Sequence, residues 1–368
     1  MENTISEIIR PRIYRKGLIL FLIMFVHLKF FVQIILDMNV VLFDILLYVL
    51  LLACIDYRHI RYSLLVLLPI VMVSLLNPAA RNIFVIFLLT YIISNLPFRT
   101  ILRYNIISQI LIFVFASICL YLGITQSVLF QQTVLDDRIR YDYGMGNPNT
   151  FALFTYSAIT NIYLYYGIRN KFVMWIILAV TLAVAKYTGS RTFLVAVIML
   201  LLFNFMRDRL IKWNKLSKVM MAVMPIILFA AIFYFSINYV QYPAVNLLFT
   251  GRLELYNSLI SRVPVSQLIV GSPLINEMTI DNSYLHIVYE GGVIPFAIFM
   301  YLYYNSIFRS SASDISILLP LFVSVFMVGL TESVLTFTLI FGNMIIWVIM
   351  YKIYLGESLS TMLKIPRL

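Results

Sequence analysis

Long uninterrupted apolar runs are the feature that most constrains how this chain can fold. One of them extends from Leu18 to Leu36, and 62% of the 368 residues are hydrophobic while only 12% are charged. A bilayer core needs about 20 apolar residues per helix, and backbone groups in lipid must be hydrogen-bonded within the segment itself. The sequence therefore predicts an all-α polytopic integral membrane protein and excludes a soluble fold.

Apolar runs and polar breaks alternate along the whole chain, which predicts one polytopic membrane domain over residues 1–368 with about twelve spans. The expected spans are 18–36, 40–55, 62–76, 83–96, 106–124, 150–168, 172–187, 192–206, 219–240, 284–304, 315–331 and 335–355. Two of the connections, about 125–149 and 241–282, are longer than tight turns and are expected to carry function.

The distribution of basic residues predicts the orientation of these spans. With the N-terminus inside, about 19 of the 27 lysines and arginines fall in cytoplasmic segments, as the positive-inside rule requires. Both termini are then cytoplasmic and both long connections lie outside. Within the second connection, Arg252 to Arg262 has the apolar spacing of a short amphipathic helix that would lie along the membrane surface. The expected location is the cytoplasmic membrane, with the active face outside.

Several function classes are excluded by composition and spacing. The net charge of +11 comes from bases scattered between spans, without the continuous basic stripe of a nucleic-acid-binding protein. The two cysteines, Cys54 and Cys119, both fall in apolar runs, which argues against a disulfide framework or a metal site. Because no phosphate-binding or metal-binding motif is present, we expect no cofactor and no metal.

Polar residues precede three helices that are expected to run from outside to inside. Gly144 to Thr150 opens one of them, with Asn147 as the expected N-cap, Pro148 at the first helical position and Asn149 beside it. Gly189-Ser190-Arg191-Thr192 opens the second, and Asp281-Asn282-Ser283-Tyr284-Leu285-His286 opens the third. Helix N-termini favour anions, so these starts are candidate anion sites, although a well-capped helix start explains the first of them equally well.

The bases expected on the outer side are all arginines, whose planar guanidinium groups bind phosphate oxygens in a bidentate manner. They are Arg81, Arg138, Arg140, Arg191, Arg252 and Arg262. Arg191 and Arg252 are the preferred pyrophosphate ligands, with Arg138 and Arg140 as further candidates. A contact with solvent or with lipid headgroups is the alternative for each; it is slightly favoured for Arg138 and Arg140 and more so for Arg81 and Arg262.

Asp281 and His286 are the candidate acid–base residues, with Asn282 and Glu290 in supporting roles. The spacing from His286 to Glu290 is four residues, which places both on one helix face. The alternatives are an N-cap for Asp281, a packed polar contact for His286 and an interhelical partner for Glu290. Other ionisable residues within or at the ends of spans are expected to be paired inside the protein or to reach the membrane surface; they are His27, Lys29, Asp44 and Glu332.

In this order the motifs resemble those of the Wzy-type polysaccharide polymerase and O-antigen ligase family. They are Gly-Asn-Pro-Asn before one span, Gly-Ser-Arg-Thr before another, Gly251-Arg252-Leu253-Glu254 in the long outer connection, and Asp-Asn-Ser-Tyr-Leu followed by Glu-Gly-Gly. The resemblance covers roughly residues 140–300. The earlier spans resemble the family only in being apolar.

The resemblance implies a metal-independent inverting glycosyltransferase that joins undecaprenyl-pyrophosphate-linked oligosaccharides, with Arg191 and Arg252 on the pyrophosphate. The product would be a capsule, an exopolysaccharide or an O-antigen, and a flippase and a chain-length regulator are expected partners. Ligase-type members carry a catalytic histidine where this chain has Asp281, which favours the polymerase. An O-antigen ligase and a transporter of lipid-linked oligosaccharides remain the alternatives.

Overall fold

The computed structural model describes residues 2–55, 64–127, 129–131, 139–168, 170–273, 280–336 and 344–364. These residues are mostly helical, and the described part contains one two-stranded sheet. The helices that are long and apolar enough to cross a membrane comprise Tyr14–Ile35, Phe98–Tyr121, Lys171–Thr188, Asn214–Ile237 and Ala312–Gly329. Shorter apolar helices accompany them at Val41–Cys54, Leu67–Leu76, Arg81–Ile93, Arg191–Phe205 and Ile345–Tyr354. The helical, membrane-type architecture expected from the apolar runs is therefore observed.

Contacts divide the chain into two compact units. Unit 1 comprises Met1–Arg61, Leu89–Phe193 and Leu339–Ile345, and unit 2 comprises Tyr62–Leu88, Leu194–Thr338 and Ile346–Leu368. Each unit is described below by itself.

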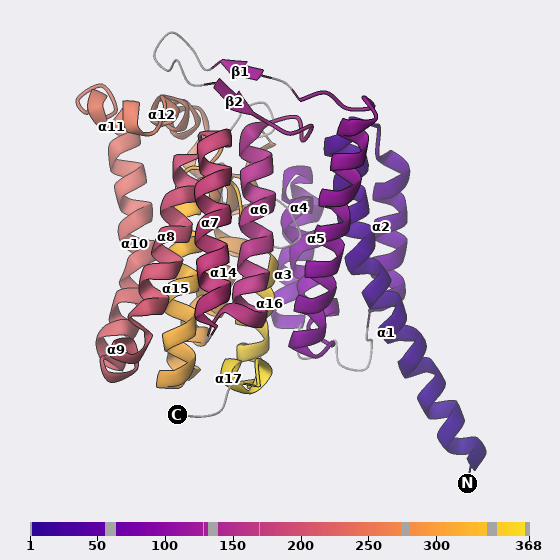
Figure 1. Ribbon diagram of the computed structural model, residues 1–368. Coiled ribbons are helices and arrows are strands. Elements are labelled where there is room, and N and C mark those ends of the chain that lie inside the picture. Colours follow the sequence, from indigo (N-terminus) through magenta and orange to yellow (C-terminus); the bar gives the residue numbers. More distant parts are fainter. Residues whose placement is uncertain are drawn as a thin grey trace. The chain divides into compact units, whose positions relative to one another are not determined.

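Unit 1 is a helical bundle with a small hairpin. Its elements are α1 (Glu2–Phe30), η1 (Phe31–Ile35), α2 (Val41–Cys54), α5 (Phe98–Tyr121), β1 (Leu129–Gln131), β2 (Ile139–Tyr141), α6 (Pro148–Ile162), η4 (Tyr163–Gly167) and α7 (Lys171–Thr188). Helix α1 packs on α2 and α5, α5 packs on α6, and α6 packs on α7. The antiparallel β1–β2 pair contacts α7 through β2 (Figure 1). Lys29 and Asp44 form an ion pair at 2.7 Å, so these two costly charges are paired as expected.

Unit 2 contains most of α4 (Arg81–Ile93) and of α8 (Arg191–Phe205), together with further helices. These are α3 (Leu64–Leu76), α9 (Arg207–Lys212), α10 (Asn214–Ile237), α11 (Pro243–Leu248), α12 (Arg252–Arg262), α13 (Ser283–His286), α14 (Val293–Arg309), α15 (Ala312–Gly329), α16 (Ile345–Tyr354) and α17 (Leu359–Met362), with single turns η3 (Pro78–Ala80), η5 (Val265–Ile269) and η7 (Ile287–Gly291). Short α9 lies at one end of α10, and α11 and α12 lie at the other (Figure 1).

Helix α12 confirms the helix predicted for Arg252 to Arg262, but its apolar face has a different partner. Leu253, Tyr256 and Leu259 are fully buried. They belong to a core cluster with Ile232 of α10, with buried residues between Ile280 and Tyr289, and with Ala79 of η3. The protein itself therefore covers the apolar face of this helix, and a location of the helix along the membrane surface stays a prediction.

The span expected at 284–304 is interrupted rather than continuous. Helix α13 and the π-helical turn η7 end at Gly292, whose backbone has φ +87°, and α14 begins at Val293. A Cβ at Gly292 would lie 2.6 Å from the carbonyl oxygen of Ile269, so only glycine permits this close approach of η5. Broken helices at membrane depth are tolerated where neighbouring protein satisfies their backbone groups, and such breaks often mark functional sites.

Candidate functional site

Asn282 fixes the start of α13. Its Oδ1 accepts hydrogen bonds from the backbone N–H groups of Tyr284 at 3.0 Å and Leu285 at 2.9 Å, while its Nδ2 donates to the carbonyl oxygen of Leu330 at 2.8 Å. Asn282 is fully buried, so all these groups are satisfied without water. The N-cap is therefore Asn282, and the alternative in which Asp281 caps this helix is wrong.

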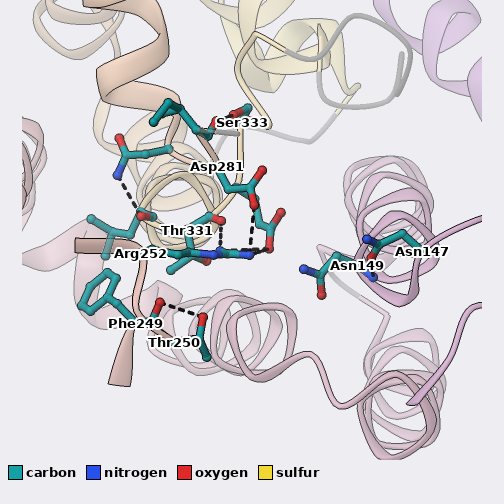
Figure 2. Close-up of polar contacts among 12 residues, drawn as sticks. Asn147, Asn149, Phe249, Thr250, Arg252, Asp281, Thr331 and Ser333 are labelled. Carbon is teal, nitrogen blue, oxygen red and sulfur yellow. Dashed lines mark hydrogen bonds and ion pairs between the residues drawn. The ribbon is translucent and has the colours of Figure 1, made fainter. Parts of the chain in front are cut away.

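Arg252, at the start of α12, lies against two carboxylates (Figure 2). Its Nη2 is 3.2 Å from Oδ2 of Asp281 and 3.4 Å from Oε1 of Glu332, and its Nη1 donates to the carbonyl oxygen of Thr331. Burial alone would lower the pKa of the guanidinium, but Glu332 and then Asp281 more than offset it, so the pKa of Arg252 is raised. Arg252 is thus a permanent cation whose charge is already compensated.

Hydrogen bonds to the backbone hold Asp281 in place. The Tyr256 hydroxyl donates to the carbonyl oxygen of Asp281 at 2.9 Å, and the Ser333 hydroxyl donates to that of Ile280 at 2.9 Å. Burial raises the pKa of Tyr256, which keeps its hydroxyl protonated as a donor. The Asp281 side chain is 39% exposed, and its Oδ1 forms no hydrogen bond with the described residues, so this fixed carboxylate is partly open to its surroundings.

A second acid–base group lies one to two turns further along. His286 Nδ1 is 2.5 Å from Oε2 of Glu290, and Asn82 Nδ2 donates to Oε1 of the same carboxylate at 3.1 Å. The Glu290 side chain is 2% exposed and that of His286 is 22% exposed. A buried carboxylate that accepts from one imidazole nitrogen orients the ring and leaves the other nitrogen as the proton acceptor.

Glu290 is surrounded by tightly packed backbone. Asn77 Nδ2 donates to the carbonyl oxygens of Glu290 at 2.8 Å and Val270 at 3.0 Å, and the N–H of Ser272 donates to the carbonyl oxygen of Tyr289 at 2.7 Å. Gly271, at φ +80°, lies so close that a Cβ there would overlap the carbonyl of Glu290. The His286–Glu290 pair is therefore held by segments distant in sequence.

In unit 1, the helix start at α6 is built as expected and is joined to Arg140. Asn147 is the N-cap, accepting from the N–H of Asn149 at 2.8 Å, and Pro148 occupies the first helical position. Arg140 donates from Nη2 to Oδ1 of Asn149 at 2.6 Å and from Nε to the carbonyl oxygen of Thr188 at 2.6 Å. Arg140 thus ties β2 to the start of α6 and to the end of α7.

The other predicted anion ligands differ from one another. Arg191, the first residue of α8, is exposed and has no hydrogen bond or ion pair with any residue that the structure describes. Arg81 and Arg262 are exposed as well. Arg138 lies outside the described residues. In the described part of the chain, no three histidine, cysteine, aspartate or glutamate side chains are grouped as metal ligands would be.

Four residues around these groups were not among the predicted site residues. Glu332 was expected to have a structural partner, and it pairs with Arg252. Nothing in the sequence pointed to Asn77, Asn82 or Tyr256 as site residues, because each contacts a segment that is distant along the chain.

Comparison of the chain with protein families, curated proteins and solved structures gives no match.

Proposed function

We propose that the chain is a polysaccharide polymerase that joins undecaprenyl-pyrophosphate-linked oligosaccharide repeats as an inverting glycosyltransferase. One observation carries the proposal. A single buried helix start in unit 2 presents a fixed, partly exposed carboxylate, Asp281, and then an imidazole–carboxylate pair, His286 and Glu290. Acid–base groups of this kind on a broken apolar helix suit chemistry on a membrane-anchored substrate.

The proposal includes a topology of about twelve crossings with both termini in the cytoplasm and the active face outside. It is supported by the overlap of every expected span with a helix of the structure, including α13 and α14 for the interrupted one. Shorter helices cross by tilting less or by local thinning of the bilayer.

The proposed reaction breaks the bond between the anomeric carbon of the growing glycan and its pyrophosphate oxygen. A hydroxyl oxygen of the incoming lipid-linked repeat forms the new bond to that carbon, its proton passes to a base, and the electron pair leaves with undecaprenyl pyrophosphate. Because pyrophosphate is a good leaving group, the protein's main tasks are positioning two substrates and stabilising the developing charge.

We assign the base to His286. Glu290 accepts from Nδ1, so Nε2 is the nitrogen that takes the acceptor proton. Asp281 accepts a hydrogen bond from the same acceptor sugar and so orients it, and Arg252 is a positioning residue that holds Asp281. In unit 1, Arg191 and Arg140 are proposed in their own right as anion ligands, since Arg191 is exposed and both stand beside helix starts.

The test is the glycan size distribution in cells that lack the protein and are complemented with variants. We expect wild type to give long polymer, and Arg191→Ala and His286→Ala to give a single exported repeat at normal protein level. Arg191→Lys should restore little polymer if bidentate geometry matters. Arg262→Ala is the matched control, because it removes another exposed outer arginine and should leave chain length unchanged.

Other outcomes would replace the proposal. Normal polymer in both Arg191→Ala and His286→Ala would overturn the assigned roles. Loss of glycan attached to lipid A, with the polymer itself intact, would identify a ligase. Single repeats retained on the cytoplasmic leaflet of the deletion strain would identify a transporter.

A further inference from the structure

The corner between α9 and α10 combines a groove with unpaired basic side chains. The groove has a volume of about 550 Å³ and is lined by Lys212, Trp213, Asn214, Lys215 and Leu216. Lys212 and Lys215 are exposed and form no ion pair or hydrogen bond with any described residue. No carboxylate is among the lining residues. The groove therefore carries positive charge that the described part of the protein leaves uncompensated.

Packing and hydrogen bonds within unit 2 fix the corner between α9 and α10. Helix α9 packs on α15, with Leu210 buried and with Arg207 Nε donating to Oγ of Ser316 at 3.3 Å. Lys218, one turn into α10, donates to the carbonyl oxygen of Phe308 at 3.5 Å. Packing thus fixes the backbone that presents Lys212 and Lys215. The one acidic side chain of α9, Asp208, is exposed and does not line the groove.

Apolar and polar groups in the groove narrow the class of ligand. The Trp213 and Leu216 side chains are 50% and 55% exposed, at the end of a helix apolar enough to cross a membrane. Tryptophan favours the interface between headgroups and acyl chains. Beside the basic Lys212 and Lys215, these side chains favour a ligand that has both a negative charge and an apolar part.

We propose that this groove binds the headgroup of an anionic phospholipid, with Lys212 and Lys215 on the phosphate. Trp213 and Leu216 contact the glycerol backbone and the first acyl carbons. A soluble phosphate or an acidic protein would satisfy the lysines but would leave this apolar pair in water.

The experiment compares lipid retention by the purified full-length protein. Protein in nanodiscs of phosphatidylcholine, with or without phosphatidylglycerol, is transferred to mild detergent, and the bound lipid is measured by native mass spectrometry. Wild type should retain phosphatidylglycerol. The double variant Lys212→Gln/Lys215→Gln should bind it about thirtyfold more weakly, from the typical contribution of each membrane-surface lysine. Lys171→Gln, at another exposed lysine that begins a helix, is the matched control and should retain the lipid.

A further arm with free glycerol phosphate separates a lipid from a soluble phosphate. Equal retention by wild type and the double variant, or equally tight binding of free glycerol phosphate, would overturn the lipid site. The substituted lysines are exposed, so folding is expected to be unaffected, and the melting temperature checks this.

Discussion

Arg191 in unit 1 and Arg252 in unit 2 were the two arginines most strongly expected to bind pyrophosphate, and their surroundings are opposite. Arg191 is exposed and has no partner among the described residues, whereas Arg252 is 16% exposed and contacts Asp281, Glu332 and the carbonyl of Thr331. A pyrophosphate at Arg252 would have to approach two carboxylates. The exposed arginine therefore suits a transient anion, and the compensated one suits a fixed structural role.

The two helix starts differ in the same way. The α6 start in unit 1 is capped by an exposed asparagine that holds one N–H group, while the α13 start in unit 2 is capped by a buried asparagine that holds two and also donates to a distant segment. Unit 2 thus fixes its polar groups through contacts among several segments. Unit 1 leaves more of them open to a ligand.

The largest expected effect is a difference in thermal stability between the variants Arg252→Ala and Arg191→Ala. Arg252→Ala leaves the Glu332 carboxylate, 9% exposed, without its cation, and breaking such a buried pair costs about 3–5 kcal/mol. Arg191→Ala removes no hydrogen bond or ion pair with the described residues, so the melting temperature should stay close to the wild-type value. Thermal unfolding of both variants in detergent and their levels in membranes measure the difference.

A charge-neutral double variant supplies the control for this comparison. Arg252→Ala/Glu332→Gln removes the stranded carboxylate and should recover part of the lost stability. A melting temperature of Arg252→Ala equal to wild type would show that the pair contributes nothing, and would restore Arg252 as a candidate pyrophosphate ligand.

Local patterns predicted local features well. The apolar period of α12 and the Asn-Pro sequence at α6 are recorded in neighbouring residues, so the helix and its cap could be derived from spacing alone. The break at Gly292 could not, because it depends on the approach of Ile269 and Gly271. Two contacts could not be predicted either: Glu332, 80 residues away, offsets the charge of Arg252, and Asn82 donates to Glu290. No pattern among neighbouring residues indicates such long-range pairs.

The second prediction compares glycines that pack against a functional residue in each unit. Gly271→Ala should destabilise unit 2 by about 1–3 kcal/mol and reduce polymer, because the new Cβ meets the rigid backbone of Glu290 and the amide of Asn77. Gly189→Ala in unit 1 has a similar positive φ, but its Cβ would meet the flexible Arg140 side chain at 3.2 Å, which can move. Its cost should be smaller, as measured by thermal unfolding.

Gly251→Ala provides the matched control for backbone strain. Its φ is +80°, as at Gly271, but a Cβ added there would have no neighbouring atom within 4 Å. The difference between Gly271→Ala and Gly251→Ala therefore isolates the steric clash at Glu290. If the two variants unfold at the same temperature, the close packing around Glu290 is not what holds the His286–Glu290 pair.

The smallest expected effect tests the two helix caps. Asn282→Ala removes two accepted N–H bonds and the donation to Leu330, so it should cost about 2 kcal/mol, the upper end for an N-cap. Asn147→Ala, at an exposed cap that holds one N–H, should cost about 0.5–1 kcal/mol. Serine can cap a helix but cannot replace the amide donor, so Asn147→Ser should be nearly neutral while Asn282→Ser should still lose the bond to Leu330. Equal losses at the two sites would mean that capping alone matters, and that the link from α13 to the end of α15 does not stabilise unit 2.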